Sequence, residues 1–125
     1  MSIATPSNPR VLIVEDETLV AMLLEDMLSD EGYEVAGSAS NIPQALKLAN
    51  GEGADFDVAI LDVNLAGQPV FAVADALAER GKPFAFATGY GQGGLPDTWR
   101  SRPTLQKPFS QADVARVLKS ALNGG

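Results

Sequence analysis

The chain has 125 residues, of which 46% are hydrophobic and 20% are charged, as in one folded globular domain and unlike a disordered or coiled-coil chain. Its net charge of −7 argues against direct binding to nucleic acid or to an acidic membrane surface. Without cysteine or histidine there is no thiolate or imidazole chemistry and no structural zinc site, so any metal must be a hard cation held by oxygen atoms.

Residues 1–9 are rich in Pro, Ser, Thr and Asn and lack the apolar core of a signal peptide, so they predict a flexible N-terminal tail. No apolar run approaches the roughly 20 residues of a membrane span. We therefore expect a cytoplasmic protein with one domain over residues 10–123, and no output domain.

The first strand is predicted over residues 10–14, where four apolar residues precede the acidic pair Glu15 and Asp16. From Glu17 the apolar period becomes helical, and Glu17 itself is interpreted as a favourable charge in the first helical turn. The residues expected to face the core are Val20, Leu23, Leu24, Met27 and Leu28. Gly32 is suited to end this helix.

A weaker, edge-like strand is predicted over residues 33–39, and Asn41 can cap a helix from about Pro43 to Asn50. The next strand is a continuous apolar run that ends in Asp62, which predicts burial on both faces of a sheet. Residues 65–69 are expected to form a loop, with Pro69 near the start of the following helix. The apolar face of that helix would contain Phe71, Val73, Ala74, Leu77 and Ala78.

The fourth strand is predicted over residues 82–88 and ends in Thr88. The following residues 89–96 contain four glycines and one proline, which cannot sustain a stable helix. A poor edge strand over residues 102–106 leads to Lys107 and Pro108. Ser110 then caps a last helix whose core-facing residues are Val114, Val117, Leu118 and Ala121.

Five alternations of strand and helix predict a parallel sheet that is covered on both faces by helices. For a chain of this length, the doubly wound solution is a flavodoxin-like α/β fold with strand order 2-1-3-4-5. We expect its fourth helix to be short or replaced by the glycine-rich loop.

In this fold the carboxyl ends of the strands meet at one edge, where ligands bind. The sequence places Glu15, Asp16, Asp62, Thr88 and Lys107 there. Close carboxylates repel one another, and one lysine leaves the cluster about two charges from neutrality. A divalent cation such as Mg²⁺ would resolve this excess, because it prefers carboxylates, waters and phosphate oxygens. A metal, a lysine and a hydroxyl beside Asp62 suit phosphoryl transfer, with Asp62 as the nucleophile that forms an aspartyl phosphate.

Together these residues resemble, in order and spacing, the receiver domain of two-component response regulators, over nearly the whole chain. The resemblance implies Mg²⁺ held by Glu15, Asp16, Asp62 and the backbone carbonyl of Asn64. It also implies a phosphoryl group that a histidine kinase supplies. Its oxygens would be bound by Thr88, Lys107 and backbone amides such as that of Gly89. Asn64 can equally be a plain turn former whose side chain has no role.

Two features depart from the usual family pattern. The family has an aromatic residue in its last strand, three positions before the lysine, where this chain has Thr104. Its fourth helix is replaced here by residues 89–96. The run from Phe86 to Tyr90 (FATGY) resembles the hallmark of the subgroup called FAT GUY, which shares both departures. We hypothesise that phosphorylation orders residues 89–96, with Tyr90 or Thr88 reaching toward the phosphoryl group; for Tyr90, simple loop packing is an equal alternative.

The main interpretation is a non-enzymatic phospho-acceptor module that acts through a partner protein, in a relay to a histidine phosphotransferase, or as a phosphate sink. An adaptor that is never phosphorylated is an alternative, although an unused cluster of like charges only destabilises a protein. A phosphohydrolase of the haloacid dehalogenase type would require a second aspartate where this chain has Asn64. A flavodoxin-like mononucleotide binder would require a glycine-rich phosphate loop after the first strand.

Overall fold

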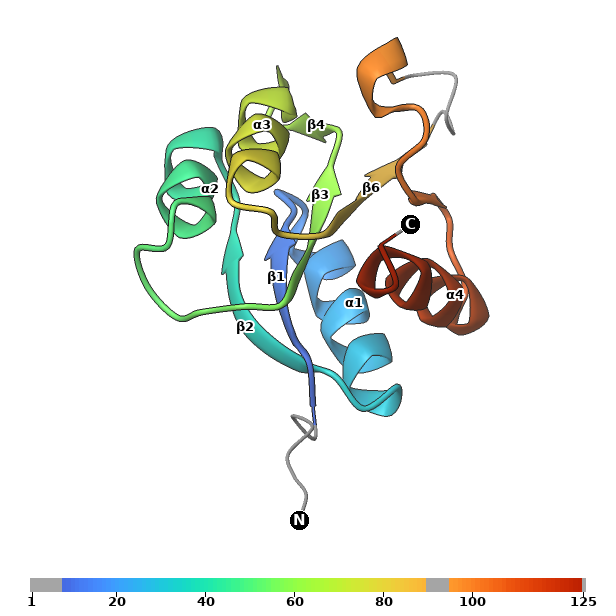
Figure 1. Cartoon of the computed structure of the whole chain (residues 1–125). Helices are drawn as coiled ribbons and strands as arrows, with labels where there is room; N and C mark the ends of the chain where they lie inside the picture. The colour runs from blue at the N-terminus through green and yellow to red at the C-terminus, as the bar shows by residue number, and fades with distance from the viewer. Residues whose placement is uncertain (1–7, 90–94, 125) are drawn as a thin grey trace.

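The computed structural model describes residues 8–89 and 95–124, and a five-stranded sheet with the order β2-β1-β3-β6-β7 forms its centre (Figure 1). Its strands are β1 (Arg10–Val14), β2 (Glu34–Ala39), β3 (Val58–Asp62), β6 (Phe84–Thr88) and β7 (Thr104–Gln106). All neighbouring strands run parallel. The predicted α/β class and the flavodoxin-like order 2-1-3-4-5 are therefore confirmed.

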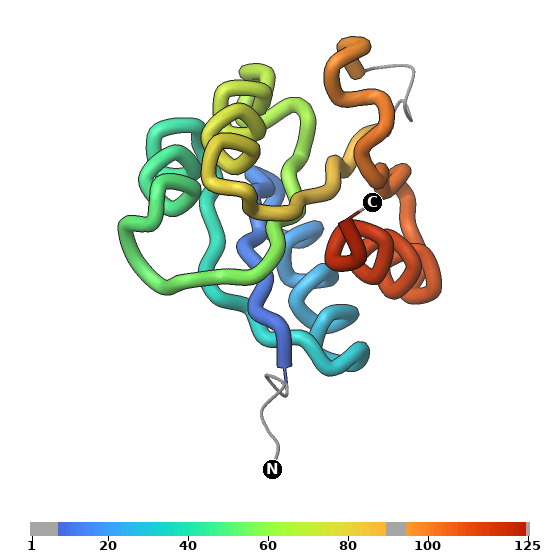
Figure 2. The backbone as a smooth tube through the Cα atoms, viewed as in Figure 1, coloured from blue at the N-terminus to red at the C-terminus, as the bar shows by residue number. Residues whose placement is uncertain are grey.

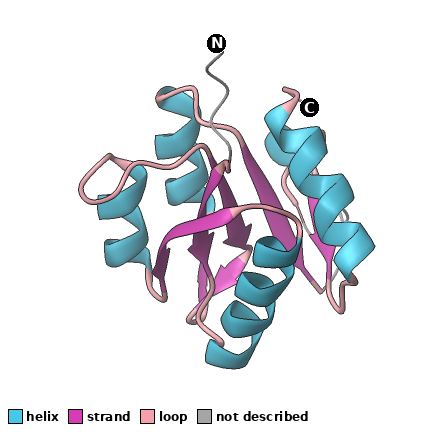
Figure 3. Ribbon diagram, turned by 90° about the horizontal axis from the view of Figure 1, so that it is seen from below, coloured by secondary structure: helices cyan, strands magenta, loops and turns pink. Residues whose placement is uncertain are grey.

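Helices cover both faces of this sheet (Figure 3). They are α1 (Thr18–Asp30), α2 (Ile42–Ala49), α3 (Phe71–Glu79) and α4 (Gln111–Leu122). Val11 and Ile13 of β1 belong to the buried cluster with α1 and α4, whereas Leu12 and Val14 belong to the cluster with α2 and α3. Because both sets of alternating side chains are buried, the strands read as continuous apolar runs. In the part of the chain that the structure describes, every helix is too short or too polar to cross a bilayer.

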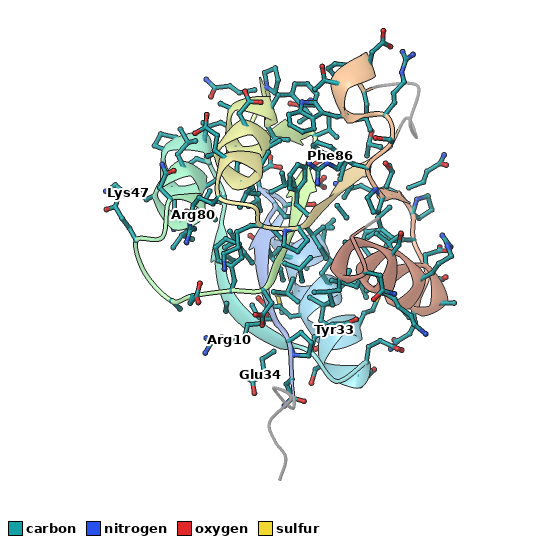
Figure 4. The ribbon with its side chains drawn as sticks, viewed as in Figure 1. Arg10, Tyr33, Glu34, Lys47, Arg80 and Phe86 are labelled. Atoms are coloured by element: carbon teal, nitrogen blue, oxygen red, sulfur yellow. The ribbon has the colours of Figure 1, made fainter. Side chains whose placement is uncertain are left out.

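The 3-10 helix η2 (Asp97–Trp99) lies between β6 and β7 and, among the described residues there, is the only helix. Its Trp99 ring packs edge-on against Phe84 and Phe86, with ring centroids 5.6 and 6.1 Å apart. Figure 4 shows Phe86 between α3 and the segment that carries η2. The chain can be followed from η2 through β7 into α4 in Figure 2. Trp99 thus packs η2 against two phenylalanines of β6.

The last helix follows the sequence-based prediction closely. Ser110 caps α4 through a capping box with Asp113, in which each side chain accepts a hydrogen bond from the backbone of the other residue. Hydrogen bonds to the Asp113 carboxylate, first from the backbone N–H of Ser110 and then from its side chain, hold the pKa of Asp113 below its ordinary value. The buried residues of α4 are the predicted ones, Val114, Val117, Leu118 and Ala121.

The predicted core face of α1 is partly wrong. Leu24 and Leu28 are buried as expected, but Leu23 is 47% exposed. Leu19 and Met22 are also exposed and lie on the same side of the helix as Leu23, at spacings of three and four residues. Because α1 carries two apolar stripes, periodicity alone could not decide which one would pack against the sheet. Ala78 of α3, also predicted to face the core, is exposed.

The loop expected over residues 65–69 is instead an antiparallel hairpin of β4 (Asn64–Leu65) and β5 (Gln68–Pro69). Its turn residues Ala66 and Gly67 have φ angles of 51° and 82°. A two-residue hairpin turn of this kind needs positive φ at both positions, and alanine rarely adopts it, so the sequence does not signal the turn. Helix α3 begins after the hairpin, at Phe71, and Pro69 lies outside it.

Residues 1–7 of the expected tail lie outside the described residues. The two residues that follow contact the edge strand β2. The Asn8 side chain donates a hydrogen bond to Glu34 Oε2, and the Glu34 backbone N–H donates to the carbonyl of Pro9.

Candidate functional site

Four of the predicted site residues lie where strands of the central sheet end. Glu15 directly follows β1, Asp62 ends β3, Thr88 ends β6, and Lys107 directly follows β7. The Glu15 N–H donates to the carbonyl of Ala39 at 3.0 Å, and the Lys107 N–H donates to that of Thr88 at 2.9 Å. Backbone hydrogen bonds therefore continue the ladder one residue beyond the strands and orient the polar side chains that follow.

The ammonium of Lys107 is the centre of this cluster. Its Nζ lies 3.0 Å from Oε1 of Glu15, 3.5 Å from Oδ2 of Asp62 and 4.0 Å from Oε1 of Glu17. The Lys107 side chain is only 21% exposed, so these ion pairs are partly shielded from water. The Lys107–Pro108 peptide bond is cis.

The carboxylates of Glu15, Asp16 and Asp62 form a compact acidic group. One oxygen of each lies within 4.8 Å of one oxygen of the other two. Glu15 and Asp62 are buried, whereas Asp16 is exposed. Oε2 of Glu15 accepts a hydrogen bond from the Glu17 N–H at 3.0 Å, while its enclosed Oε1 faces the Lys107 ammonium. Three carboxylates this close together offer the oxygen donors that a hard cation takes.

Burial and mutual repulsion set the protonation of Asp62. Burial of its side chain and the nearby charge of Glu15 raise the pKa of Asp62 to about 7. The Lys107 ammonium and a hydrogen bond from the Asn64 backbone act in the opposite direction but do not cancel this effect. Burial alone would lower the pKa of Lys107, yet the hydrogen bond to Glu15 and the charge of Asp62 outweigh burial and raise it. The site therefore holds its lysine charged and carries excess negative charge.

The remaining predicted residues surround this group. Thr88 is 3% exposed, at the end of β6. Gly89 is exposed, and a Cβ placed on it would meet no atom of the described residues within 4 Å. The Asn64 side chain is exposed, and its backbone begins β4. Tyr90 lies outside the described residues.

The interpretation of Glu17 from the sequence is incomplete. Glu17 is the N-cap residue of α1, before the first turn, and its side chain makes no capping hydrogen bond. Its carboxylate approaches Lys107 instead. One feature of the sequence indicates the contact between Glu17 and Lys107. Three acidic residues in a row follow β1, and a single lysine follows β7 at the same edge of the sheet.

Comparisons with known proteins agree with this geometry. The family model of the response regulator receiver domain matches residues 11–93. The transcriptional regulatory protein PdtaR of Mycobacterium tuberculosis is 34% identical over 118 residues, which cover 91% of this chain and 57% of PdtaR. The phyllosphere-induced regulator PhyR of Methylorubrum extorquens is 33% identical over 124 residues, which cover 96% of this chain and 46% of PhyR. The chain thus spans about half the length of the curated relatives it matches.

Among solved structures, that of SdrG from Sphingomonas melonis is 43% identical, with a TM-score of 0.81. The match covers 94% of this chain and 99% of SdrG. The sheet order, the acidic group at the strand ends and these matches all lead to one assignment. The chain belongs to the response regulator receiver domains, a family of signalling regulators and not of enzymes.

Proposed function

We propose that this receiver domain accepts a phosphoryl group on Asp62 from a sensor histidine kinase, in a reaction that depends on Mg²⁺. The observation that carries the proposal is the position of the Lys107 ammonium, 3.5 Å from the Asp62 carboxylate and 3.0 Å from that of Glu15. A fixed cation beside a nucleophilic carboxylate stabilises the negative charge that a phosphoryl group brings to the site.

The donor set suits a magnesium ion. Oxygens of Glu15, Asp16 and Asp62 lie within 4.8 Å of one another, and the side chains of Glu15 and Asp62 are buried. These carboxylates and the backbone carbonyl of Asn64 would hold the ion. When bound, Mg²⁺ would neutralise part of the charge on the phosphoryl oxygens.

Each residue of the site would have its own role in the transfer of the phosphoryl group to Asp62. A carboxylate oxygen of Asp62 forms a bond to phosphorus while the bond from phosphorus to the imidazole nitrogen of the kinase breaks, and that nitrogen keeps the electron pair and is protonated from solvent. Lys107 then donates to a phosphoryl oxygen. Thr88, the backbone N–H of Gly89 and Tyr90 are the proposed further donors to the group.

We further propose that the domain works in the cytoplasm through a separate protein, in a relay to a histidine phosphotransferase, or as a phosphate sink. One solved relative, PhyR of Bartonella quintana, is described as an anti-anti-sigma factor; it is 28% identical, and this chain covers 49% of its length. That description supports signalling by protein contact. Membership of the FAT GUY subgroup is supported by Thr104 in β7 and by the short helix η2.

The direct test is the mass of the intact protein after incubation with Mg²⁺ and acetyl phosphate, or with a phosphorylated histidine kinase. We expect one phosphoryl increment that requires the metal and is absent from Asp62→Asn. The replacement keeps the size of the side chain but turns the nucleophilic carboxylate into a neutral amide. If neither donor gave an increment, the proposal would fail and an unphosphorylated adaptor would replace it.

A further inference from the structure

We infer that Glu17 is a specificity-determining residue at the entrance to the Asp62 site. It disfavours small anionic phosphodonors and favours a protein donor that brings a positive charge beside its phosphoryl group. The inference rests on the proposed function, because it concerns the donor of the same reaction.

The first observation is the place of the Glu17 carboxylate. It lies 4.0 Å from Lys107 Nζ, on the exposed side of the site, and is 65% exposed, whereas the carboxylates of Glu15 and Asp62 are 1% and 9% exposed. A donor from solvent meets Glu17 before it meets the buried acids. Glu17 therefore offsets the charge of Lys107 at the point where an anionic donor must enter.

The second observation is that the Glu17 side chain does not cap helix α1. Glu17 is the N-cap residue of α1, but it is not one of the residue types that cap helices well, and its side chain accepts no hydrogen bond from the first turn. Its backbone N–H is held by Oε2 of Glu15 at 3.0 Å. The backbone of Glu17 is thus tied to the acidic group, and its carboxylate points to the lysine and not to the helix.

The third observation is an apolar groove beside Glu17, with a volume of about 350 Å³. It is lined by Glu17, Val20, Leu23, Lys107, Pro108 and Phe109. Leu23 is 47% exposed in the same part of α1. A small acyl phosphate cannot use an apolar groove, whereas a protein can place an apolar side chain in it and a lysine or arginine against Glu17. Both features thus favour a protein donor.

The size of the effect follows from Coulomb's law. A unit charge about 4 Å away through water changes an encounter equilibrium by about fivefold, and more where water is partly excluded. Whether the Glu17 charge weakens or strengthens the encounter depends on the charge of the phosphodonor. Acetyl phosphate is a dianion at neutral pH, whereas phosphoramidate carries an ammonium group on the leaving nitrogen. Removal of the Glu17 charge should therefore help the first donor more than the second.

In both reactions Asp62 forms the new bond to phosphorus. The bond from phosphorus to the acetate oxygen breaks in one case and acetate leaves with the electron pair. The bond from phosphorus to nitrogen breaks in the other case and ammonia leaves. Both reactions give the same aspartyl phosphate, so a change in the ratio of their rates reports on the entrance and not on the product.

The experiment compares the wild-type protein, Glu17→Gln and the control Glu79→Gln, which removes one charge from the exposed surface of α3. Phosphorylation rates with each donor are measured in saturating Mg²⁺ at low and at high ionic strength. We expect Glu17→Gln to raise the rate constant for acetyl phosphate about fivefold at low salt, with a smaller gain at high salt. The gain for phosphoramidate should be smaller, and Glu79→Gln should change neither rate.

A binding measurement without transfer complements these rates. Inorganic phosphate is titrated into Asp62→Asn, with and without Glu17→Gln, and the amide chemical shift of Lys107 is followed. We expect about fivefold tighter binding when Glu17 is neutral. An unchanged ratio of donor rates together with unchanged phosphate binding would overturn the inference alone. Absence of phosphorylation by any donor in every variant would overturn the proposed function as well.

Discussion

Lys107 Nζ lies closer to Glu15 than to Asp62, at 3.0 Å from Oε1 of the first and 3.5 Å from Oδ2 of the second. Glu15 is the more deeply buried of the two acids, with 1% of its side chain exposed. It therefore holds the ammonium in place beside Asp62 before any phosphoryl group is present. The lysine is prepositioned, and its binding to a phosphoryl oxygen needs little rearrangement.

Removal of this lysine should destabilise the metal-free protein. Lys107→Met leaves the acids of Glu15 and Asp62 without their cation, and breaking a buried pair in this way costs about 3 kcal/mol, or less where a side chain is partly exposed. We expect the free energy of unfolding in urea at neutral pH to fall by about 2 kcal/mol. The matched variant Lys119→Met, on the exposed side of α4, should change it by less than about 0.5 kcal/mol. Equal effects of the two variants would contradict the buried ion pair.

Asp62 should make the metal-free protein less stable as the pH rises. Its pKa is raised from the ordinary 3.8 to about 7 by burial and by Glu15. Between these values the unfolded chain releases the proton while the folded chain retains it, so the free energy of unfolding falls through this window and then levels off. Because a tenfold change in proton affinity corresponds to about 1.4 kcal/mol, the expected loss is roughly 2 to 4 kcal/mol.

The measurement is the difference in unfolding free energy between Asp62→Asn and the wild type, followed from pH 4 to pH 8 without metal. The difference cancels titrations elsewhere in the chain. It should grow in favour of the asparagine variant as the pH rises. A difference that is constant with pH would show that Asp62 titrates at its ordinary value in the fold.

Trp99 should contribute strongly to stability through its contacts with Phe84 and Phe86. Trp99→Ala leaves a gap on the α2 and α3 face of the sheet and should lower the free energy of unfolding by about 3 kcal/mol. Trp99→Phe retains an aromatic ring and should lose less than half as much. The exposed neighbour Thr98 provides the control, because Thr98→Ala should be nearly neutral. If Trp99→Ala were as mild as Thr98→Ala, the packing role of η2 would be refuted.

The hypothesis that phosphorylation orders residues 89–96 concerns a segment of which residues 90–94 lie outside the described residues. It predicts that amide hydrogen exchange in residues 89–96 slows when Asp62 is phosphorylated. The β2 strand, at the far edge of the sheet, provides an internal control that should not change. Exchange that is equally fast in both states would exclude this form of the switch.

Local sequence was sufficient for the strands of the central sheet, the four α-helices and their order, because apolar runs, helical periods and caps act over a few residues. The cap at Ser110 and the buried face of α4 are examples. The candidate site was also predictable in outline, because a parallel sheet brings the carboxyl ends of its strands to one edge. Glu15 and Lys107 are far apart in the chain, yet this rule alone places them together.

Other features depended on tertiary packing. Leu23 and Leu24 are adjacent and chemically identical, and only the position of α1 on the sheet decides that one is exposed and the other buried. The hairpin after Asp62 requires Ala66 to adopt a positive φ, which local preferences disfavour, while the neighbouring Leu65 is buried in the core.

The sequence by itself determined the five strands of the central sheet, the four α-helices, the fold class and which polar residues follow the strands. The tertiary structure decided the environment of each side chain. It packs Trp99 against Phe84 and Phe86 of β6 and brings the Glu17 carboxylate to Lys107. The physical reason is the range of the interactions. Periodicity and capping are properties of neighbouring residues, whereas burial and ion pairing depend on atoms that only folding brings together.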